Sequence, residues 1–145
     1  MRTMEHLIVV AAILINNDEI LCAQRGKSEY DYISQKYEFP GGTVEPGETL
    51  EIALVRELEE ELLIRIDRET ISHFLTVEHT YPDFSVSLHS FLCPVESRAF
   101  VKTEHLDCQW LPCDKLNKLD WATADIPIVN KLVCEGYGHG FGEER

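Results

Sequence analysis

The chain has 145 residues, 44% of them hydrophobic, and carries 26 acidic against 13 basic residues, which gives a formal net charge of −13 at pH 7. This length suffices for one compact core, so we expect residues 1–145 to form a single domain. The negative charge argues against a nucleic-acid polymer as a partner, because that binding needs clustered Lys and Arg. A small phosphorylated substrate is compatible with the negative net charge if metal ions reverse the local charge at the site.

The cysteines and the apolar segments indicate the cellular compartment of the protein. Five cysteines form an odd set without a C-x-x-C pair or the spacing of metal ligands. The sequence shows neither the pattern of a secretory signal peptide nor an apolar stretch near the roughly 18 residues of a membrane span. We therefore expect a reduced, cytoplasmic protein with no membrane partner. Nothing marks an oligomer interface, so monomer and homodimer both stay open.

Apolar, β-branched runs bounded by turn residues predict strands along the whole chain. In chain order the expected strands cover residues 6–15, 19–24, 37–39, 71–79, 85–95 and 108–111. A hairpin is expected at Asn16-Asn17-Asp18, and a polar loop over 26–36. Pro40-Gly41-Gly42 should stop the third strand.

Two segments have features that predict helices. Glu48 is expected to open the first helix with Thr49 as its cap. The buried stripe predicted for this helix comprises Leu50, Leu54, Val55, Leu58 and Leu62. A second helix is expected from Asp125 or Ile126 to Cys134, and the glycine-rich residues 136–145 are expected to form a flexible tail.

The first helix also carries carboxylates beside its apolar stripe. At roughly 100° per residue, Glu57, Glu60 and Glu61 project from one side, within an arc that one Mg²⁺ or a metal pair could bridge. Arg56 flanks that arc. A run of this kind is most often a solvated helix face. However, like charges at i and i+4 destabilise a helix, so the pair Glu57 and Glu61 favours a compensating cation.

Two adjacent glycines precede this helix. Gly41 and Gly42 allow the backbone to turn closely and to present a carbonyl oxygen toward the same carboxylates. Hard oxygen ligands of this kind are the ones that Mg²⁺ and Mn²⁺ prefer. The glycines and the acidic helix together predict a divalent metal site, with a solvated helix face as the alternative.

Residues 42–64 resemble the signature of the Nudix hydrolases, G-x5-E-x7-R-E-U-x-E-E-x-G-U with U aliphatic. The matching residues are Gly42, Glu48, Arg56, Glu57, Leu58, Glu60, Glu61 and Ile64. Leu63 stands where the signature has its second glycine, so the left-handed helix end that glycine allows is expected to be missing or strained. Further segments are similar to the MutT-like branch, most closely to enzymes acting on CTP and its modified deoxy forms: VVAAILINNDEILCAQR, YEFPGG, TEH before CQWL, and ADIP.

The resemblance implies an α/β fold, an α/β/α sandwich on a mixed sheet, and Mg²⁺-dependent hydrolysis of a nucleoside triphosphate to a monophosphate and pyrophosphate, with Mn²⁺ as a possible substitute. The metal ligands that it implies are the Gly41 carbonyl, Glu57, Glu60, Glu61 and Glu104, and the four glutamates are also the implied catalytic residues. Glu57 resembles the residue that ligates metal or activates the attacking water. Gly42, Glu48 and Arg56 have structural roles in this pattern, the last two as an ion pair, and the alternative for Glu48 is contact with a metal through water.

For two of the implied residues outside the helix, an ordinary surface side chain is the alternative to a functional role. Glu104 stands six residues before Trp110 and matches a glutamate that faces the metal, as ligand or general base; an exposed loop glutamate is the alternative. Arg25 matches a triphosphate-binding arginine, with a surface arginine as the alternative. Lys36 is a weaker candidate for the phosphates.

Base recognition is implied for three residues. Asp125 matches the position that reads the base edge, and a helix N-cap is its alternative. An ionised carboxylate only accepts hydrogen bonds, so it should favour an amino or imino N–H such as N4 of cytosine. Phe39 and Tyr81 match aromatic positions that stack on the base or belong to the core.

Three functions stay open on the sequence. The first is a pyrophosphohydrolase acting on a small-molecule nucleotide, either (d)CTP or a modified form such as 5-methyl-dCTP or 8-oxo-dGTP. The second keeps the chemistry but acts on ADP-ribose or a dinucleoside polyphosphate. The third is a non-catalytic, nucleotide-sensing domain, whose usual mark would be a lost glutamate at position 57, 60 or 61, and none is lost.

Overall fold

A strand that is apolar on both faces organises the sheet. In the computed structural model, which describes residues 4–136, β1 (Glu5–Asn16) is buried on both sides from Val10 to Ile15. It pairs along its length with the parallel strand β6 (Phe84–Pro94). Its other edge is divided, because β4 (Gly41–Thr43) pairs with its middle and β2 (Glu19–Gln24) with its end, both antiparallel.

The remaining strands complete a mixed sheet. They are β3 (Tyr37–Glu38), β5 (Ser72–Thr80) and β7 (Asp107–Leu111). The strand order is β3-β2-β1-β6-β5, while β4 pairs with β1 and β7 with β2. The helices are α1 (Leu50–Leu62) and α2 (Ile126–Glu135), with short 3₁₀ segments at Arg68–Thr70, Cys113–Lys118 and Thr123–Asp125.

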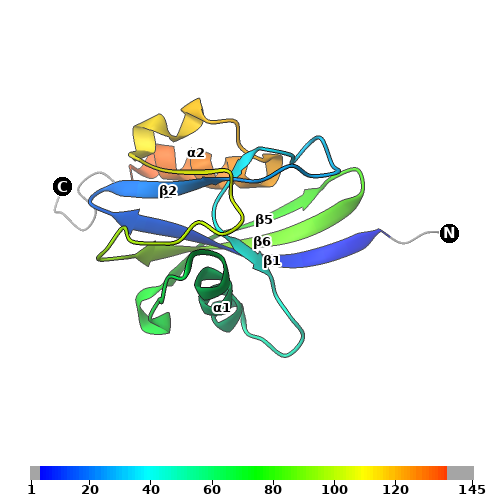
Figure 1. Ribbon diagram of the computed structural model, residues 1–145. Helices are drawn as coiled ribbons and strands as arrows, with labels where there is room; N and C mark the ends of the chain where they lie inside the picture. The colour runs from blue at the N-terminus through cyan, green and yellow to red at the C-terminus, as the bar shows by residue number, and fades with distance from the viewer. Residues whose placement is uncertain (1–3, 137–145) are drawn as a thin grey trace.

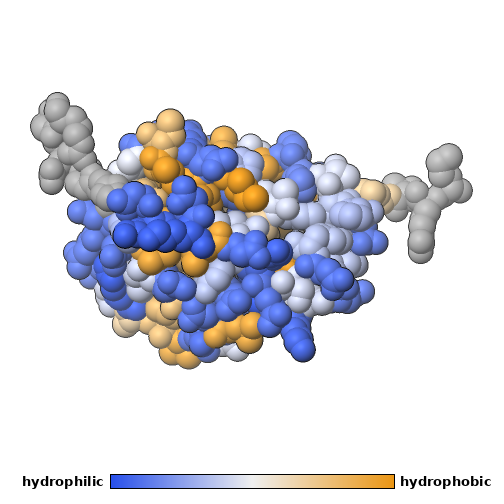
Figure 2. Space-filling view, turned by 90° about the horizontal axis from the view of Figure 1, so that it is seen from above, coloured by the Kyte–Doolittle hydropathy of each residue, from blue (hydrophilic) through white to orange (hydrophobic). Residues whose placement is uncertain are grey.

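The two helices cover opposite faces of the sheet (Figure 1). Under α1, Leu54, Leu58 and Leu62 pack against the β1 side chains that point to that face. On the other face, Ile128 and Leu132 of α2 belong to a second core cluster. Seen from above, on the α2 side, hydrophobic residues form separate patches between hydrophilic ones (Figure 2). The expected α/β/α sandwich on a mixed sheet is confirmed.

The structure changes some of the expected boundaries. The third strand ends at Glu38, just before Pro40-Gly41-Gly42, but Gly41 and Gly42 also begin a new strand, β4, which pairs with β1. A Cβ at Gly41 would overlap the Val10 carbonyl, so this pairing requires glycine. Helix α1 begins at Leu50, after the Thr49 cap, rather than at Glu48.

The buried stripe of α1 also differs from the predicted one. Ala53 is fully buried, whereas Leu50 and Val55 are half-buried at the border of the core. Within residues 4–136, no helix has the length and apolar character needed to cross a bilayer. The predicted tail lies outside the described residues, apart from Gly136.

Leu63 adopts the left-handed conformation that its position in the signature requires. Its φ and ψ are 55° and 36°, and its N–H donates to the Glu59 carbonyl at 3.1 Å. Leu63 therefore keeps the helix end that glycine would form, at the steric cost that a Cβ brings in this region. Its side chain is 59% exposed, so little packing offsets that cost.

Replacing Leu63 with glycine should stabilise the protein. Leu63→Gly removes the Cβ clash and should raise the free energy of unfolding by about 1 kcal/mol, measured by urea denaturation. Leu63→Ala is the matched control, since it shortens the side chain but keeps the Cβ, and it should show no such gain. A glycine variant no more stable than the alanine variant would contradict the strain at this residue.

Candidate active site

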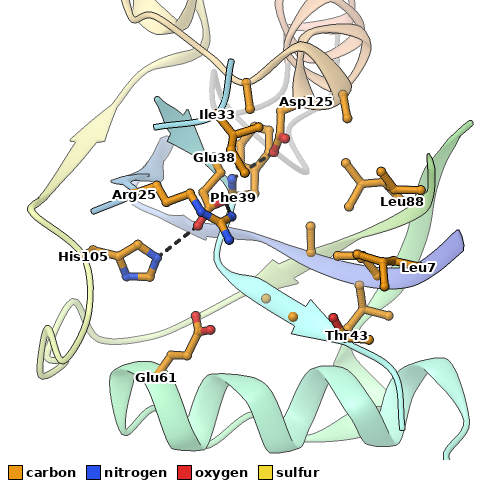
Figure 3. Close-up of a pocket in the computed structure, with 18 of the residues that line it drawn as sticks. Leu7, Arg25, Ile33, Glu38, Phe39, Thr43, Glu61, Leu88, His105 and Asp125 are labelled. Atoms are coloured by element: carbon orange, nitrogen blue, oxygen red, sulfur yellow. Dashed lines mark hydrogen bonds and ion pairs between the residues drawn. The ribbon is translucent and has the colours of Figure 1, made fainter. Parts of the chain in front are cut away.

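A cavity of about 420 Å³ lies at the divided edge of β1, between the end of α1 and the start of α2 (Figure 3). Its two sides differ in character. Arg25, His105 and Glu61 lie on one side, and Leu7 and Leu88 on the other. The pocket can therefore hold a molecule with a charged part and an apolar part.

Arg56 connects the loop before α1 to the helix itself. Its Nε and Nη2 donate to the two carboxylate oxygens of Glu48 at 2.6 and 2.9 Å, and Nη2 also donates to the Thr43 carbonyl at 3.1 Å. Its Nη1 donates to Glu57 at 2.9 Å and to Glu60 at 3.2 Å. These hydrogen bonds from Arg56 lower the pKa of Glu48 to about 2. The ion pair of Glu48 and Arg56 thus ties the loop to the helix.

The three carboxylates at the end of α1 lie in different surroundings. Glu60 is exposed, whereas the Glu57 carboxylate lies so close to Gly42 that a Cβ there would overlap it. Burial raises the pKa of Glu57, although Arg56 opposes the shift. Glu61 lines the pocket, and its Oε1 is buried with no hydrogen-bond partner among residues 4–136.

The Glu61 carboxyl is the most perturbed of the three. Burial, and then the negative charges of Glu57, Glu38 and Glu104, raise the pKa of Glu61 to about 8. A bound cation would satisfy the unpaired Glu61 oxygen and offset this repulsion. The donors are hard oxygen atoms, which suit Mg²⁺ or Mn²⁺.

In this structure the glutamates implied as metal ligands do not converge on one point. Among the described residues, no three His, Cys, Asp or Glu side chains form a cluster that could hold one. Arg56 draws Glu57 and Glu60 toward itself, whereas Glu61 and Glu104 border the pocket. A cation shared by these glutamates would therefore compete with the hydrogen bonds that Arg56 donates to Glu57 and Glu60.

Arg25 is held at the pocket by residues that the sequence did not single out. Its Nη1 donates to Glu38 at 2.9 Å, and the other Glu38 oxygen lies 3.4 Å from His105 Nε2. Lys27 also lines the pocket. Glu38 and His105 fall in the segments YEFPGG and TEH, which was the one signal that could have identified them. Lys36 donates to Asp120 at 2.8 Å instead and does not line the pocket.

Asp125 faces the pocket although it occupies the cap position of α2. Its Oδ2 accepts a hydrogen bond at 3.1 Å from the Phe39 N–H. Within residues 4–136, which include all of α2, the Asp125 side chain accepts no capping hydrogen bond from the N–H groups of that helix. It is 6% exposed, and burial followed by the negative charge of Glu38 raises the pKa of Asp125 to about 8. Asp125 is therefore mainly neutral at pH 7, which corrects the assumption that it is ionised. A neutral carboxyl both donates and accepts.

The two aromatic candidates line the pocket and belong to the core. Phe39 stacks on Trp121 with ring centroids 4.7 Å apart. Tyr81 stacks on Tyr32 at 5.1 Å, and its hydroxyl accepts from the Ala124 N–H at 2.9 Å. Both rings thus already have an aromatic partner on one face.

The comparisons with known proteins identify the family. The family model of the NUDIX domain matches residues 5–132. The 8-oxo-dGTP diphosphatase of Escherichia coli is 34% identical over 125 residues, which cover 86% of this chain and 94% of that protein. The CTP pyrophosphohydrolase of Escherichia coli is 34% identical over 133 residues, covering 90% and 94%.

A solved structure gives the same result at the level of the fold. The DNA mismatch repair protein MutT from methicillin-resistant Staphylococcus aureus is 37% identical, with a TM-score of 0.69. The match covers 92% of this chain and 100% of that chain.

The buried Asp125 should make stability fall as the pH rises. Its pKa is about 3.8 in an unfolded chain and about 8 in the fold, so between these values the folded state keeps a proton that the unfolded state releases. The free energy of unfolding should then decrease by on the order of 1 kcal/mol per pH unit from this residue.

Asp125→Asn isolates that effect, because asparagine can still accept from the Phe39 N–H but does not titrate. Urea denaturation from pH 5 to 8 should give a shallower decline for the variant than for the wild type. Glu61 shifts in the same direction but is present in both proteins, so it does not alter the comparison. Parallel curves would show that Asp125 is ionised in the fold.

Proposed function

Since this chain belongs to the NUDIX domain family, we propose that it is a Mg²⁺-dependent hydrolase that converts a nucleoside triphosphate to the monophosphate and pyrophosphate. The observation that carries the proposal is the composition of the pocket. A buried Glu61 oxygen without a hydrogen-bond partner among residues 4–136 and cationic side chains line one side, and apolar side chains line the other. The enzymes named above, with which the chain shares 34% identity, support this reaction class.

The charged side of the pocket would take the phosphates. Arg25 and Lys27 are the cationic side chains there, and Arg25 is already oriented by its 2.9 Å hydrogen bond to Glu38. A guanidinium held in this way can bind phosphate oxygens with two parallel hydrogen bonds. The net charge of −13 does not oppose binding, because the substrate would enter together with a divalent cation.

The residues that would hold Mg²⁺ are Glu57, Glu60, Glu61, Glu104 and the Gly41 carbonyl. The bound ion would stabilise the charge that develops on the phosphoryl oxygens. Removal of a proton from the attacking water is assigned to Glu57 or Glu104. The Glu57 carboxylate lies against Gly42, which lines the pocket, and Glu104 borders the pocket itself.

The apolar side would take the nucleoside, with Asp125 reading the base. A neutral carboxyl can accept from the N4 amino group of cytosine and donate to its N3. The same groups match the N1–H and O6 of guanine and equally the N3–H and O4 of uracil, so Asp125 alone does not exclude a uracil nucleotide. The enzymes named above support (d)CTP, 5-methyl-dCTP and 8-oxo-dGTP as the substrates to test first. Phe39 and Tyr81 would border the base from the core.

A nucleotide panel with Mg²⁺ tests the proposed reaction. Pyrophosphate release should be fastest with CTP, dCTP, 5-methyl-dCTP or 8-oxo-dGTP, and dUTP is included to show whether the pocket selects against uracil. Faster cleavage of ADP-ribose or a dinucleoside polyphosphate would replace the proposed substrate class. No turnover with any of these compounds would leave only a nucleotide-sensing domain.

Glu61 should be essential for turnover but not for folding. Glu61→Gln removes the charge from the proposed metal ligand and should lower kcat about 100-fold or more, measured by pyrophosphate release. Glu59→Gln makes the same chemical change on the same helix, at a side chain paired with Arg65, and should leave kcat near the wild-type value. Equal activities of the two variants would remove Glu61 from the proposed site.

Asp125 should control base choice more than phosphate chemistry. Asp125→Ala should lower kcat/KM for dCTP by about 10-fold with kcat within about 2-fold, because one good base-reading contact contributes about 1–3 kcal/mol. If kcat/KM for dCTP stays at the wild-type value, Asp125 only supports the backbone at Phe39.

A further inference from the structure

A distant segment completes the C-terminal end of α1. The last carbonyl groups of a helix lack partners within the helix. Here the Glu61 carbonyl accepts from Thr103 Oγ1 at 2.6 Å, and the Leu62 carbonyl accepts from the Val101 N–H at 2.9 Å. Both donors belong to residues 95–106, the connection from β6 to β7, which we call the strap. The strap is therefore bonded to the same turn of α1 that carries the Glu61 side chain.

The strap is also anchored to the sheet on both sides of this contact. Before it, Arg98 donates to the Asn16 side chain at 2.8 Å, to the Asn16 carbonyl at 2.9 Å and to Glu19 at 2.9 Å. After it, the Leu106 N–H donates to the Gln24 carbonyl at 2.8 Å. The strap thus runs between fixed points on the β1–β2 hairpin and on β2.

Glu104 lies between two of these anchors. It is exposed and borders the pocket, and no hydrogen bond or ion pair within residues 4–136 holds its carboxylate. Its charge nevertheless contributes to the raised pKa of Glu61. The position of Glu104 relative to Glu61 therefore depends on the backbone of the strap, and Thr103, the residue directly before it, supplies the nearest bond to α1.

We propose that Thr103 is a positioning residue, whose hydrogen bond to the Glu61 carbonyl holds the Glu104 carboxylate where it and Glu61 can bind the same divalent cation. This inference rests on the function proposed for the pocket. Thr103 itself is not a ligand. It acts through the backbone, as outer partners of metal ligands commonly do when they fix a ligand's orientation.

The test compares metal binding and turnover in variants at position 103. Thr103→Val keeps the shape but loses the hydroxyl. It should weaken Mn²⁺ binding to the metal-free protein about 10-fold, as measured by electron spin resonance of free Mn²⁺, and lower kcat by a similar factor with KM within about 2-fold. Thr103→Ser restores the donor and should return both values toward the wild type. Thr70→Val, which removes the 2.8 Å hydrogen bond to the Asp67 carbonyl away from the pocket, should change neither.

A double-mutant cycle separates positioning from a merely structural role. If Thr103 acts through Glu104, then Thr103→Val should have little further effect on Mn²⁺ affinity in a Glu104→Gln background. Fully additive effects, an unchanged Mn²⁺ affinity in Thr103→Val, or no Mn²⁺ binding by the wild type would each overturn the proposal. Absence of hydrolysis by the wild type would instead overturn the proposed function, while the Mn²⁺ titrations would still decide the role of Thr103.

Discussion

The close approach of β4 to its neighbours is the constraint on which the site depends. Gly41 has no side chain to overlap the Val10 carbonyl, and Gly42 has none to overlap the Glu57 carboxylate. Both contacts occur within one short strand, so β1, β4 and the end of α1 can meet at one place. The backbone of Gly41 and Gly42 consequently lines the pocket, with the Glu57 carboxylate against Gly42 and the Glu61 side chain at the pocket wall.

The negative charge of the site is compensated unevenly. Arg56 shares its single positive charge among Glu48, Glu57 and Glu60 through hydrogen bonds of 2.6 to 3.2 Å. Within residues 4–136, neither Glu61 nor Asp125 has a hydrogen bond to Lys or Arg, and burial raises the pKa of each to about 8. The fold therefore holds two acidic groups at the pocket, the partly buried Glu61 and the buried Asp125, which no hydrogen-bonded cation within residues 4–136 offsets.

Local patterns predicted most of the elements, and the exceptions have physical reasons. The long strands and α1 follow from hydrophobic spacing, and each was placed to within about two residues. Strand β4 was missed because glycine has no intrinsic preference for strands, and its pairing with β1 results from the absence of side chains in a crowded place. Leu63 was correctly identified as the strained position, because the requirement for a left-handed residue is itself local.

The sequence by itself determined the family and the functional residues of α1, the helix that carries the Nudix signature. The spacing of Arg56, Glu57, Glu60 and Glu61 is read within a few turns of one helix, and helix geometry is independent of the rest of the fold. Only the tertiary structure decided that Asp125 turns to the Phe39 N–H, that Glu38 joins Arg25 to His105, and that Thr103 of the strap donates to the Glu61 carbonyl. These contacts join residues far apart in the chain, and the burial that shifts their pKa values exists only once both faces of the sheet are packed.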